Sequence, residues 1–471
     1  MTDYIQDFIS DYLKEINEKN AAIFAGAGLS IESGHVSWKE LLVDIASGLN
    51  LDINKENDLV TLSQYHLNSN GNNRSVLNQK LLSNFHHGSK PNINHEILSR
   101  LPISTYWTTN YDKLIEKSLD IANKIVDVKY TEEQLSHTVH GREVVLYKMH
   151  GDVDHPSEAI ISKDQYEKYF KTHGLFINAL SGDLISKTFL FIGFSFTDPN
   201  LDYILSRIRV SYKENQRKHY CILKEVKQEN DTFEDFQYKK IKQSLAIADL
   251  LRFNIHTILV KEYADITHIL KMIENRFRRK TIYISGSAVE YDGRTTEQAG
   301  HLISTLCQSL IKNEYKIVSG FGLGVGSFVI EGALREVYLN KKENLKDQLL
   351  LRPFPQSGEN IQETWKRYRQ DMISYTGISI FMFGNKLKDE ELVDADGLEK
   401  EFEISISNNS LVIPIGATGY IAEKLWKKVL DNYEKYFSKI EGKDLYIKLG
   451  DKTLSEEELV NTIIEFINFN L

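Results

Sequence analysis

The segment Ala21-Ala22-Ile23-Phe24-Ala25-Gly26-Ala27-Gly28-Leu29-Ser30 decides the fold of the first half of the chain. A short apolar run leads directly into two glycines one residue apart, and a serine follows them. A buried strand that ends in such a turn presents backbone N–H groups with no side chain to keep a phosphate away. Because tight glycine turns also join strands to helices without binding anything, a plain turn stays open as an alternative.

Length, charge and cysteine content narrow the class of protein. A chain of 471 residues is too long for one hydrophobic core and predicts two to three domains. The net charge of -9, with no long block of Lys or Arg, argues against a nucleic-acid partner. The two cysteines, Cys221 and Cys307, cannot form a four-cysteine zinc site, so we expect no metal and a reducing, cytoplasmic location. No apolar run approaches the ~18 residues of a membrane span, so we expect no membrane partner.

Further strands in the first half end in residues that suit a nucleotide site. The β-rich segments 104–109, 144–149 and 188–192 each lead into polar residues or glycine, and 219–223 predicts another strand. Short apolar strands that alternate with helices indicate an α/β fold with a doubly wound parallel sheet, whose ligand sits outside the carboxyl ends of the strands. Together with the opening strand, these strand ends supply Gly26, Gly28, Asn110, Asp112, His150, Gly193 and Ser195.

The pattern restarts near residue 278, which predicts a second doubly wound, Rossmann-like domain over 279–471 after a first over 1–278. Thr281–Ser287 again runs from a strand into glycine, and Gly320–Gly326 is dense in glycine just before a helix. This second run suits a phosphate or nucleotide cradle, with close strand–helix packing as the alternative. In the helix that contains Lys366, Arg367 and Arg369, we expect one cation to point inward, where Arg suits bidentate phosphate capture.

The ordered motifs Gly26–Ser30, Thr109–Asp112, Met149–Gly151 and Gly193–Ser195 resemble the NAD-binding core of sirtuins over roughly residues 10–275. The resemblance implies that the glycine loop holds the pyrophosphate and that Asn110 and Asp112 orient the nicotinamide ribose. Asn110 would also place a water near the anomeric carbon, and His150 would act as general base or as a partner of a ribose hydroxyl. The implied residues are Asn110 and His150 for catalysis, and Ala25, Gly26, Ala27, Gly28, Ser30, Asp112, Gly193 and Ser195 for NAD.

The chain departs from sirtuin deacetylases in two respects. It lacks their four-cysteine zinc module, and Ile31-Glu32-Ser33-Gly34-His35 stands in place of Pro-Asp-Phe-Arg. We therefore expect an NAD glycohydrolase with water as acceptor, NAD as substrate and no cofactor or zinc. A structural role for His150 and a helix-capping role for Asn110 remain alternatives. His66, His86, His87 and His95 have no motif around them, so we expect them on the surface.

The second half resembles the SLOG nucleotide-sensing family, which is related to the LOG phosphoribohydrolases. The resemblance rests on Ser285–Ser287, Gly320–Gly326, Arg369 with Met372, and Gly397–Glu401. Where those enzymes carry Pro-Gly-Gly, this chain has Gly384-Asn385-Lys386 and an acidic insertion to Asp396, which favours binding over catalysis. The residues expected to hold a signal ligand are Gly286, Ser287, Gly322, Gly324, Gly326, Arg369, Lys386 and Glu401.

The order sirtuin-like then SLOG resembles the NAD-depleting effector family of the bacterial Thoeris antiphage system. The resemblance implies that a TIR-domain partner makes a cyclic ADP-ribose isomer on infection. The SLOG domain of a homotetramer would bind this signal and release NAD hydrolysis, which ends in abortive infection. Two alternatives stay open, namely a non-enzymatic sensor of NAD or another nucleotide, and a LOG-like phosphoribohydrolase that uses Arg369 and Glu401.

Overall fold

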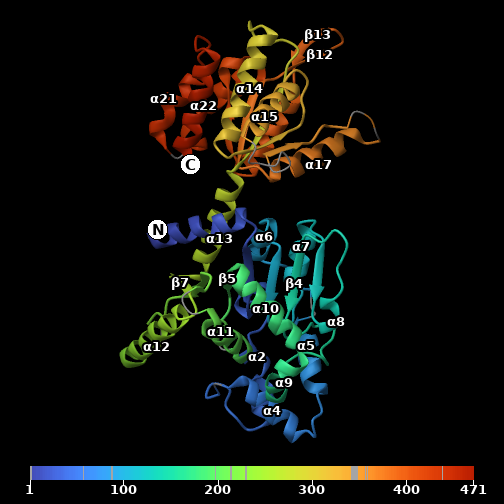
Figure 1. Ribbon diagram of the computed structural model, residues 1–471, viewed down its shortest axis with the longest axis vertical. Helices are drawn as coiled ribbons and strands as arrows, with labels where there is room; N and C mark the ends of the chain where they lie inside the picture. The colour runs from blue at the N-terminus through green and yellow to red at the C-terminus, as the bar shows by residue number, and fades with distance from the viewer. Residues whose placement is uncertain are drawn as a thin grey trace. The chain divides into compact units, whose positions relative to one another are not determined.

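The computed structural model describes residues 3–56, 58–85, 88–196, 198–212, 215–228, 231–340, 348–355, 357, 359–437 and 439–471. The chain forms two compact units, Met1–Glu274 and Asn275–Leu471 (Figure 1). The division falls within helix α13 (Tyr263–Arg278), whose last residue is the position at which the sequence predicts the boundary. Each unit is built around a parallel sheet of its own.

The first unit contains a seven-stranded parallel sheet in the order β3-β4-β2-β1-β5-β6-β7. Its strands are β1 (Ala21–Ala25), β2 (Thr105–Thr108), β3 (Val126–Lys129), β4 (Val144–Lys148), β5 (Thr188–Ile192), β6 (His219–Lys224) and β7 (Ile255–Val260). Every residue of β1 and β5 is buried, as expected where helices cover both faces of a sheet. The predicted doubly wound α/β fold is confirmed, and β3 and β7 are added to it.

Helices cover the sheet and also build a separate cap. They are α1 (Asp3–Asn17), α2 (Trp38–Leu41), α3 (Val43–Gly48), α4 (Leu59–Ser69), α5 (Ser75–Phe85), α6 (Ile93–Arg100), α7 (Leu114–Ile121), α8 (Glu132–Leu135), α9 (Lys163–Thr172), α10 (Gly174–Ser186), α11 (Pro199–Tyr212), α12 (Phe233–Leu251) and α13. The helices α2 to α5 share an apolar cluster of their own, which includes Leu41, Leu62 and Leu81 and reaches Tyr111 beside the strand ends. The cap therefore borders the carboxyl edge of the sheet.

Strand β1 lies at the topological switch of this sheet. From β1 the chain builds β2, β4 and β3 on one side, and β5, β6 and β7 on the other. Because the connections leave in opposite directions, a crevice opens outside the carboxyl ends of β1 and β5. The glycine turn that follows β1 therefore lies at this crevice, where a doubly wound sheet is expected to bind its ligand.

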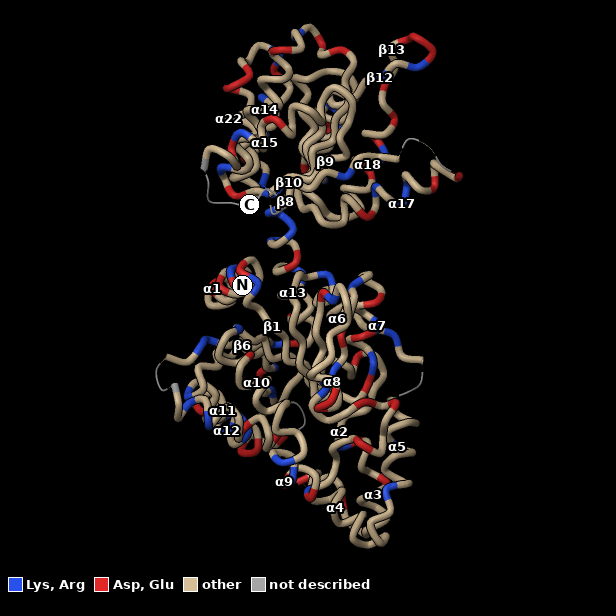
Figure 2. The backbone as a smooth tube through the Cα atoms, turned by 45° about the vertical axis from the view of Figure 1, so that its right-hand side comes forward, with Lys and Arg blue, Asp and Glu red and all other residues tan. Residues whose placement is uncertain are grey.

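The second unit contains a five-stranded parallel sheet in the order β10-β9-β8-β11-β14 and a separate hairpin. The strands are β8 (Thr281–Ser287), β9 (Lys316–Ser319), β10 (Leu349–Leu351), β11 (Ile378–Phe383) and β14 (Leu411–Pro414), and the hairpin is β12 (Asn385–Lys388) with β13 (Glu391–Asp394). The helices are α14 (Thr296–Lys312), α15 (Gly326–Asn340), α17 (Ile361–Ser374), α18 (Asp396–Ser407), α19 (Tyr420–Asp431), α20 (Tyr433–Tyr436), α21 (Lys443–Lys448) and α22 (Glu456–Asn470). The acidic insertion is this hairpin, and its acidic turn is visible in Figure 2.

In the second unit, helix α14 lies in the main apolar core. Its residues Leu302, Leu306 and Leu310 are fully buried, together with Ile282 of the central strand β8. Among the helices of the described residues, none is long and apolar enough to cross a membrane.

Candidate active site

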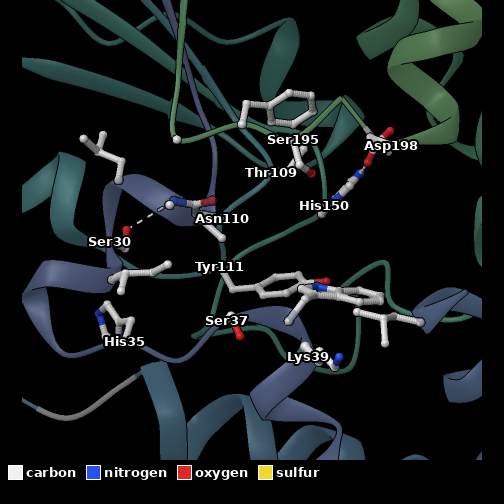
Figure 3. Close-up of a pocket in the computed structure, with 18 of the residues that line it drawn as sticks. Ser30, His35, Ser37, Lys39, Thr109, Asn110, Tyr111, His150, Ser195 and Asp198 are labelled. Carbon is white, nitrogen blue, oxygen red and sulfur yellow. Dashed lines mark hydrogen bonds and ion pairs between the residues drawn. The ribbon is translucent and has the colours of Figure 1, made fainter. Parts of the chain in front are cut away.

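A cavity of about 1250 Å³ lies in the first unit among residues that follow β1, β2, β4 and β5. Its walls include most of the NAD-site residues predicted from sequence, which are Ala27, Gly28, Ser30, Asn110, Asp112, His150, Gly193 and Ser195. Ala25 and Gly26 do not line it, because Ala25 is the buried last residue of β1 and Gly26 packs against the turn after β5. The structure thus brings residues from four strand ends to one cavity (Figure 3).

The glycines hold the turns after β1 and β5 in direct backbone contact. A Cβ atom on Gly26 would lie 2.4 Å from the carbonyl oxygen of Gly193, and one on Gly193 would lie 2.2 Å from the nitrogen of Leu29. Gly193 also has φ +65°, a conformation that favours glycine. The N–H groups of Gly26 and Gly28 donate to the oxygens of Ile192 and Gly193, both at 2.9 Å. These glycines therefore have a packing role whether or not the loop meets a phosphate.

Asn110 presents an unpaired acceptor at the cavity. Its Nδ2 donates to the carbonyl oxygen of Gly26 at 3.1 Å and to Ser30 Oγ at 3.2 Å. Because the Gly26 carbonyl only accepts, this contact fixes the orientation of the amide. Asn110 Oδ1 is buried and has no hydrogen-bond partner among the described residues. A buried polar atom of this kind normally requires a partner, so the site suits a water or ligand hydroxyl here.

Asp112 contacts Asn110 indirectly, through the hydroxyl of Ser30. Its Oδ2 accepts from Ser30 Oγ at 2.9 Å, and its Oδ1 accepts from the N–H of Leu114 at the start of α7. The relay Asn110–Ser30–Asp112 thus links the turns after β1 and β2. Figure 3 shows its contact between Ser30 and Asn110. Since Asp112 bonds the first turn of α7, the alternative that Asn110 caps that helix is wrong.

His150 follows β4 and faces Asp198, a residue that the sequence analysis missed. The imidazole is only 3 % exposed, and its Nε2 lies 3.1 Å from Asp198 Oδ2 (Figure 3). The hydroxyl of Tyr166 on α9 makes a longer contact of 3.4 Å with His150 Nδ1. Both Asp198 and Tyr166 line the cavity. The available sequence signal was Asp198-Pro199, which is typical of a helix start.

Asp198 is a buried carboxylate whose surroundings favour its charged form. Its Oδ1 accepts from the N–H groups of Asn200 and Leu201 at the start of α11. Burial would raise the pKa of Asp198, but His150 and these two N–H groups hold it below its ordinary value. The carboxylate therefore stays charged beside the imidazole at neutral pH.

A buried lysine joins the turns that carry Asn110 and His150. Lys148 is fully buried, and its Nζ lies 2.6 Å from Asp152 Oδ2 and 2.9 Å from Glu116 Oε1. It also donates to the carbonyl oxygens of Tyr111 and Asp112. Burial would lower the pKa of Lys148, yet the two carboxylates raise it above its usual value. This cation fixes the turn after β2 against the turn after β4.

The histidines without a motif lie in different places. His66 is half-buried, and His86 and His87 fall outside the described residues. The expectation that His95 lies on the surface is wrong, because it is buried on α6 and its Nδ1 contacts Asn92 Oδ1 at 2.9 Å. Burial lowers the pKa of His95 to about 4, so it is neutral at physiological pH.

In the second unit, Arg369 and Glu401 meet beside the central strand. Arg369 Nε lies 3.1 Å from Glu401 Oε1, and Ser285 Oγ of β8 donates to Glu401 Oε2 at 2.6 Å. The guanidinium also lies 4.8 Å from the ring centre of Phe354. Arg369 is therefore the inward-pointing cation that the sequence predicts for this helix. Within the described part of the chain, its Nη1 and Nη2 have no hydrogen-bond partner.

The glycine run of the second unit packs against the loop after β8. Cβ atoms on Gly322 and Gly324 would lie 1.9 Å and 2.0 Å from the carbonyl oxygens of Gly286 and Ala288. Gly326 begins α15, where a Cβ atom would meet Phe321. Close backbone packing therefore accounts for these glycines.

Residues of β12 support the same loop. Ser287 Oγ donates to the backbone oxygen of Asn385, whose buried side chain accepts from the N–H groups of Val289 and Glu290. Sequence reasoning assigned no role to Asn385. Lys386, by contrast, is partly exposed and pairs with Asp396.

The fold and the site define a class of protein, a SIR2-like domain followed by a SLOG domain. The model of a SIR2-like domain matches residues 104–246, and the model of the Sir2- and TIR-associating SLOG family matches residues 265–470. Among the described residues, no group of three or more His, Cys, Asp or Glu side chains is arranged to hold a metal ion.

Relatives that match along the whole chain give the family. A protein named NAD(+) hydrolase ThsA from Bacillus cereus (strain MSX-D12) is 54% identical over 470 residues, which cover 99% of this chain and 98% of the relative. Another of that name from Cytobacillus dafuensis is 47% identical over 98% of this chain and 95% of its own. Defense-associated sirtuin 2 of Bacillus subtilis is 25% identical over 58% of this chain and 28% of its own. The chain belongs to the ThsA family.

Proposed function

We propose that the first unit hydrolyses the N-glycosidic bond of NAD and releases nicotinamide and ADP-ribose. The observation that carries the proposal is the unpaired Oδ1 of Asn110, on the wall of the cavity that His150 also lines. The cavity lies where a doubly wound sheet binds its ligand, and its size suits a dinucleotide. Relatives that are named NAD(+) hydrolase match this chain over almost their whole length, and they support the same substrate.

The chemistry divides between the two polar residues. As the bond from the ribose carbon to nicotinamide breaks, its electron pair passes to the pyridinium nitrogen, and nicotinamide leaves as a neutral molecule. The ribose carbon then carries positive charge, and a water oxygen bonds to it. Asn110 Oδ1 would accept a hydrogen bond from this water and place it, while His150 would take the released proton and pass it to solvent. Ala27, Gly28, Ser30, Gly193 and Ser195 would contact the rest of the dinucleotide.

The test measures nicotinamide released from NAD by the full-length protein, with and without a panel of cyclic ADP-ribose isomers. We expect release in the presence of one isomer, and a loss of at least about 100-fold in His150→Ala. Binding of NAD without turnover under every isomer would instead support a non-enzymatic sensor.

We further propose that the second unit binds a cyclic ADP-ribose-type signal that switches on the first. Support comes from the SLOG family match and from Arg369, whose guanidinium suits a phosphate group. The ligand would lie among Gly286, Ser287, Gly322, Gly324, Gly326, Arg369, Lys386 and Glu401. Cleavage of a nucleoside monophosphate, lost in Glu401→Ala, would point instead to a phosphoribohydrolase.

The proposed setting is antiphage defence in the bacterial cytoplasm, ending in abortive infection. A TIR-domain partner would make the signal, and this chain would act as a homotetramer. The description of the matched SLOG family as associated with Sir2 and TIR supports that partnership. Cells that carry both genes should lose NAD on phage infection, whereas cells with His150→Ala should keep it. Light scattering on the purified protein tests the tetramer.

A further inference from the structure

Resting on the proposed hydrolysis of NAD, we propose that Asp198 is the positioning residue of His150. Its carboxylate would hold the imidazole at the cavity wall and stabilise the ring when it carries a proton. Asp198 would not touch the reacting atoms, because its action passes through His150.

The geometry carries this proposal. Asp198 Oδ2 lies 3.1 Å from His150 Nε2, and the side chains are 8% and 3% exposed. Opposite charges interact strongly at such a distance when water is largely excluded. The alignment falls short of a good hydrogen bond, so Asp198 would act on the imidazole through its negative charge.

The two carboxylate oxygens of Asp198 have different partners. Oδ1 accepts from the N–H groups of Asn200 and Leu201 and so anchors the carboxylate to α11. Oδ2 is thereby aimed at His150. A helix N-terminus favours a negative charge, which keeps the carboxylate ionised for this role.

Other groups around the imidazole carry little compensating charge. From α9, Tyr166 and Tyr169 present rings 5.2 Å and 6.3 Å from the ring of His150, and the hydroxyl of Tyr169 donates to the backbone oxygen of Met149. Burial raises the pKa of both tyrosines well above the ordinary value, so they are neutral. His173 stacks on Tyr169, and burial lowers the pKa of His173, which favours its neutral form. Lys148, on the preceding strand, is engaged with Asp152 and Glu116.

The structure also supplies matched variants. Asp198→Asn removes the charge but keeps an oxygen for the cap, and Asp198→Ser keeps a good cap without a carboxylate. Asp202→Asn is the charge control, because Asp202 is exposed on the first turn of the same helix and does not line the cavity. All three variants should fold, which differential scanning calorimetry checks.

The experiment records turnover of NAD against pH for each variant. Because both substitutions remove the negative charge beside the ring, the pH dependence of turnover should change in Asp198→Asn and Asp198→Ser. The maximal rate should fall at least about tenfold, since a less restrained base remains. Asp202→Asn should match the unsubstituted protein in both respects.

A second measurement does not depend on activity. In NMR spectra of histidine-labelled protein, the imidazole signal that disappears in His150→Ala should change its chemical shift in Asp198→Asn and keep it in Asp202→Asn, because only Asp198 contacts the ring. An unchanged imidazole signal and an unchanged activity profile in Asp198→Asn would overturn the proposal and leave Asp198 as a helix cap. If the unsubstituted protein and Asp202→Asn release no nicotinamide, the proposed hydrolysis fails, while the NMR result still decides the role of Asp198.

Discussion

Replacing Lys148 by methionine should destabilise the first unit more than most single substitutions. Methionine fills a similar volume but removes a cation that contacts two carboxylates and two backbone oxygens. The side chain of Asp152 is 2% exposed and that of Glu116 is 18% exposed, so solvent cannot replace the ammonium group. Removing one partner of a buried ion pair costs about 3–5 kcal/mol, and we expect a loss in this range at pH 7.5.

The loss should depend on pH in a defined direction. Burial would raise the pKa of Asp152, but Lys148 lowers it below the unfolded value. Its stabilising contribution is therefore present above the unfolded pKa and is lost as pH falls through the folded one. The pKa of Lys148 is raised, so its own contribution is complete below the unfolded value and is lost only in alkali. The difference between Lys148→Met and the parent protein should consequently keep its full value from pH 7.5 down to the unfolded pKa of Asp152 and shrink below it.

Urea unfolding, followed by tryptophan fluorescence to which Trp38 and Trp107 of the first unit contribute, measures this change. Neutralising the partners as well, in Lys148→Met/Asp152→Asn/Glu116→Gln, should recover much of the loss because no unpaired charge stays buried. A loss below about 1 kcal/mol in Lys148→Met, or no recovery in the triple variant, would mean that Lys148 does not stabilise the first unit by neutralising buried carboxylates.

Three further predictions follow from close contacts. Gly193→Ala should lower the free energy of unfolding by more than about 2 kcal/mol, because its Cβ would lie 2.2 Å from the nitrogen of Leu29. Gly141→Ala is the control, since Gly141 has a similar φ of +71° but no atom nearer than 3.6 Å, and it should cost only about 1 kcal/mol. Equal losses in urea unfolding would contradict this. Arg369→Lys should raise the half-activating concentration of the cyclic ligand about tenfold or more, and an unchanged value would count against phosphate capture. Asn385→Ala should destabilise the second unit by about 1–3 kcal/mol, since it leaves two partly buried N–H groups without their acceptor. Calorimetry should show the thermal transition of the second unit moving to lower temperature while that of the first unit stays.

The strands that build the site could be predicted because each couples an apolar run to a polar end. β1 and β5 are buried on both faces, so their sequences carry no alternation that might be confused with a surface strand. By contrast, β3 contains Asp127 and Lys129, which pair at 2.6 Å while buried. A buried ion pair makes a strand polar in sequence, so the pattern gave no apolar signal.

The missed site residues share a different cause. Tyr166 reaches His150 from α9, and Asp198 reaches it from the residue before α11. Nothing in their local sequence indicates which strand end they face. His95 has no motif around it, so its sequence does not indicate burial, although its partly buried partner Asn92 lies only three positions earlier. The sequence therefore predicts which site residues follow strands better than it predicts those that only tertiary packing brings to the site.

The role of Asn110 in NAD hydrolysis is tested by the rate of nicotinamide release by Asn110→Ala at saturating NAD and saturating signal ligand. The substitution removes the unpaired Oδ1 that would place the attacking water. We predict a fall of at least about 100-fold, with NAD still bound in equilibrium dialysis. A rate within threefold of the parent protein, with NAD bound equally well, would contradict the account.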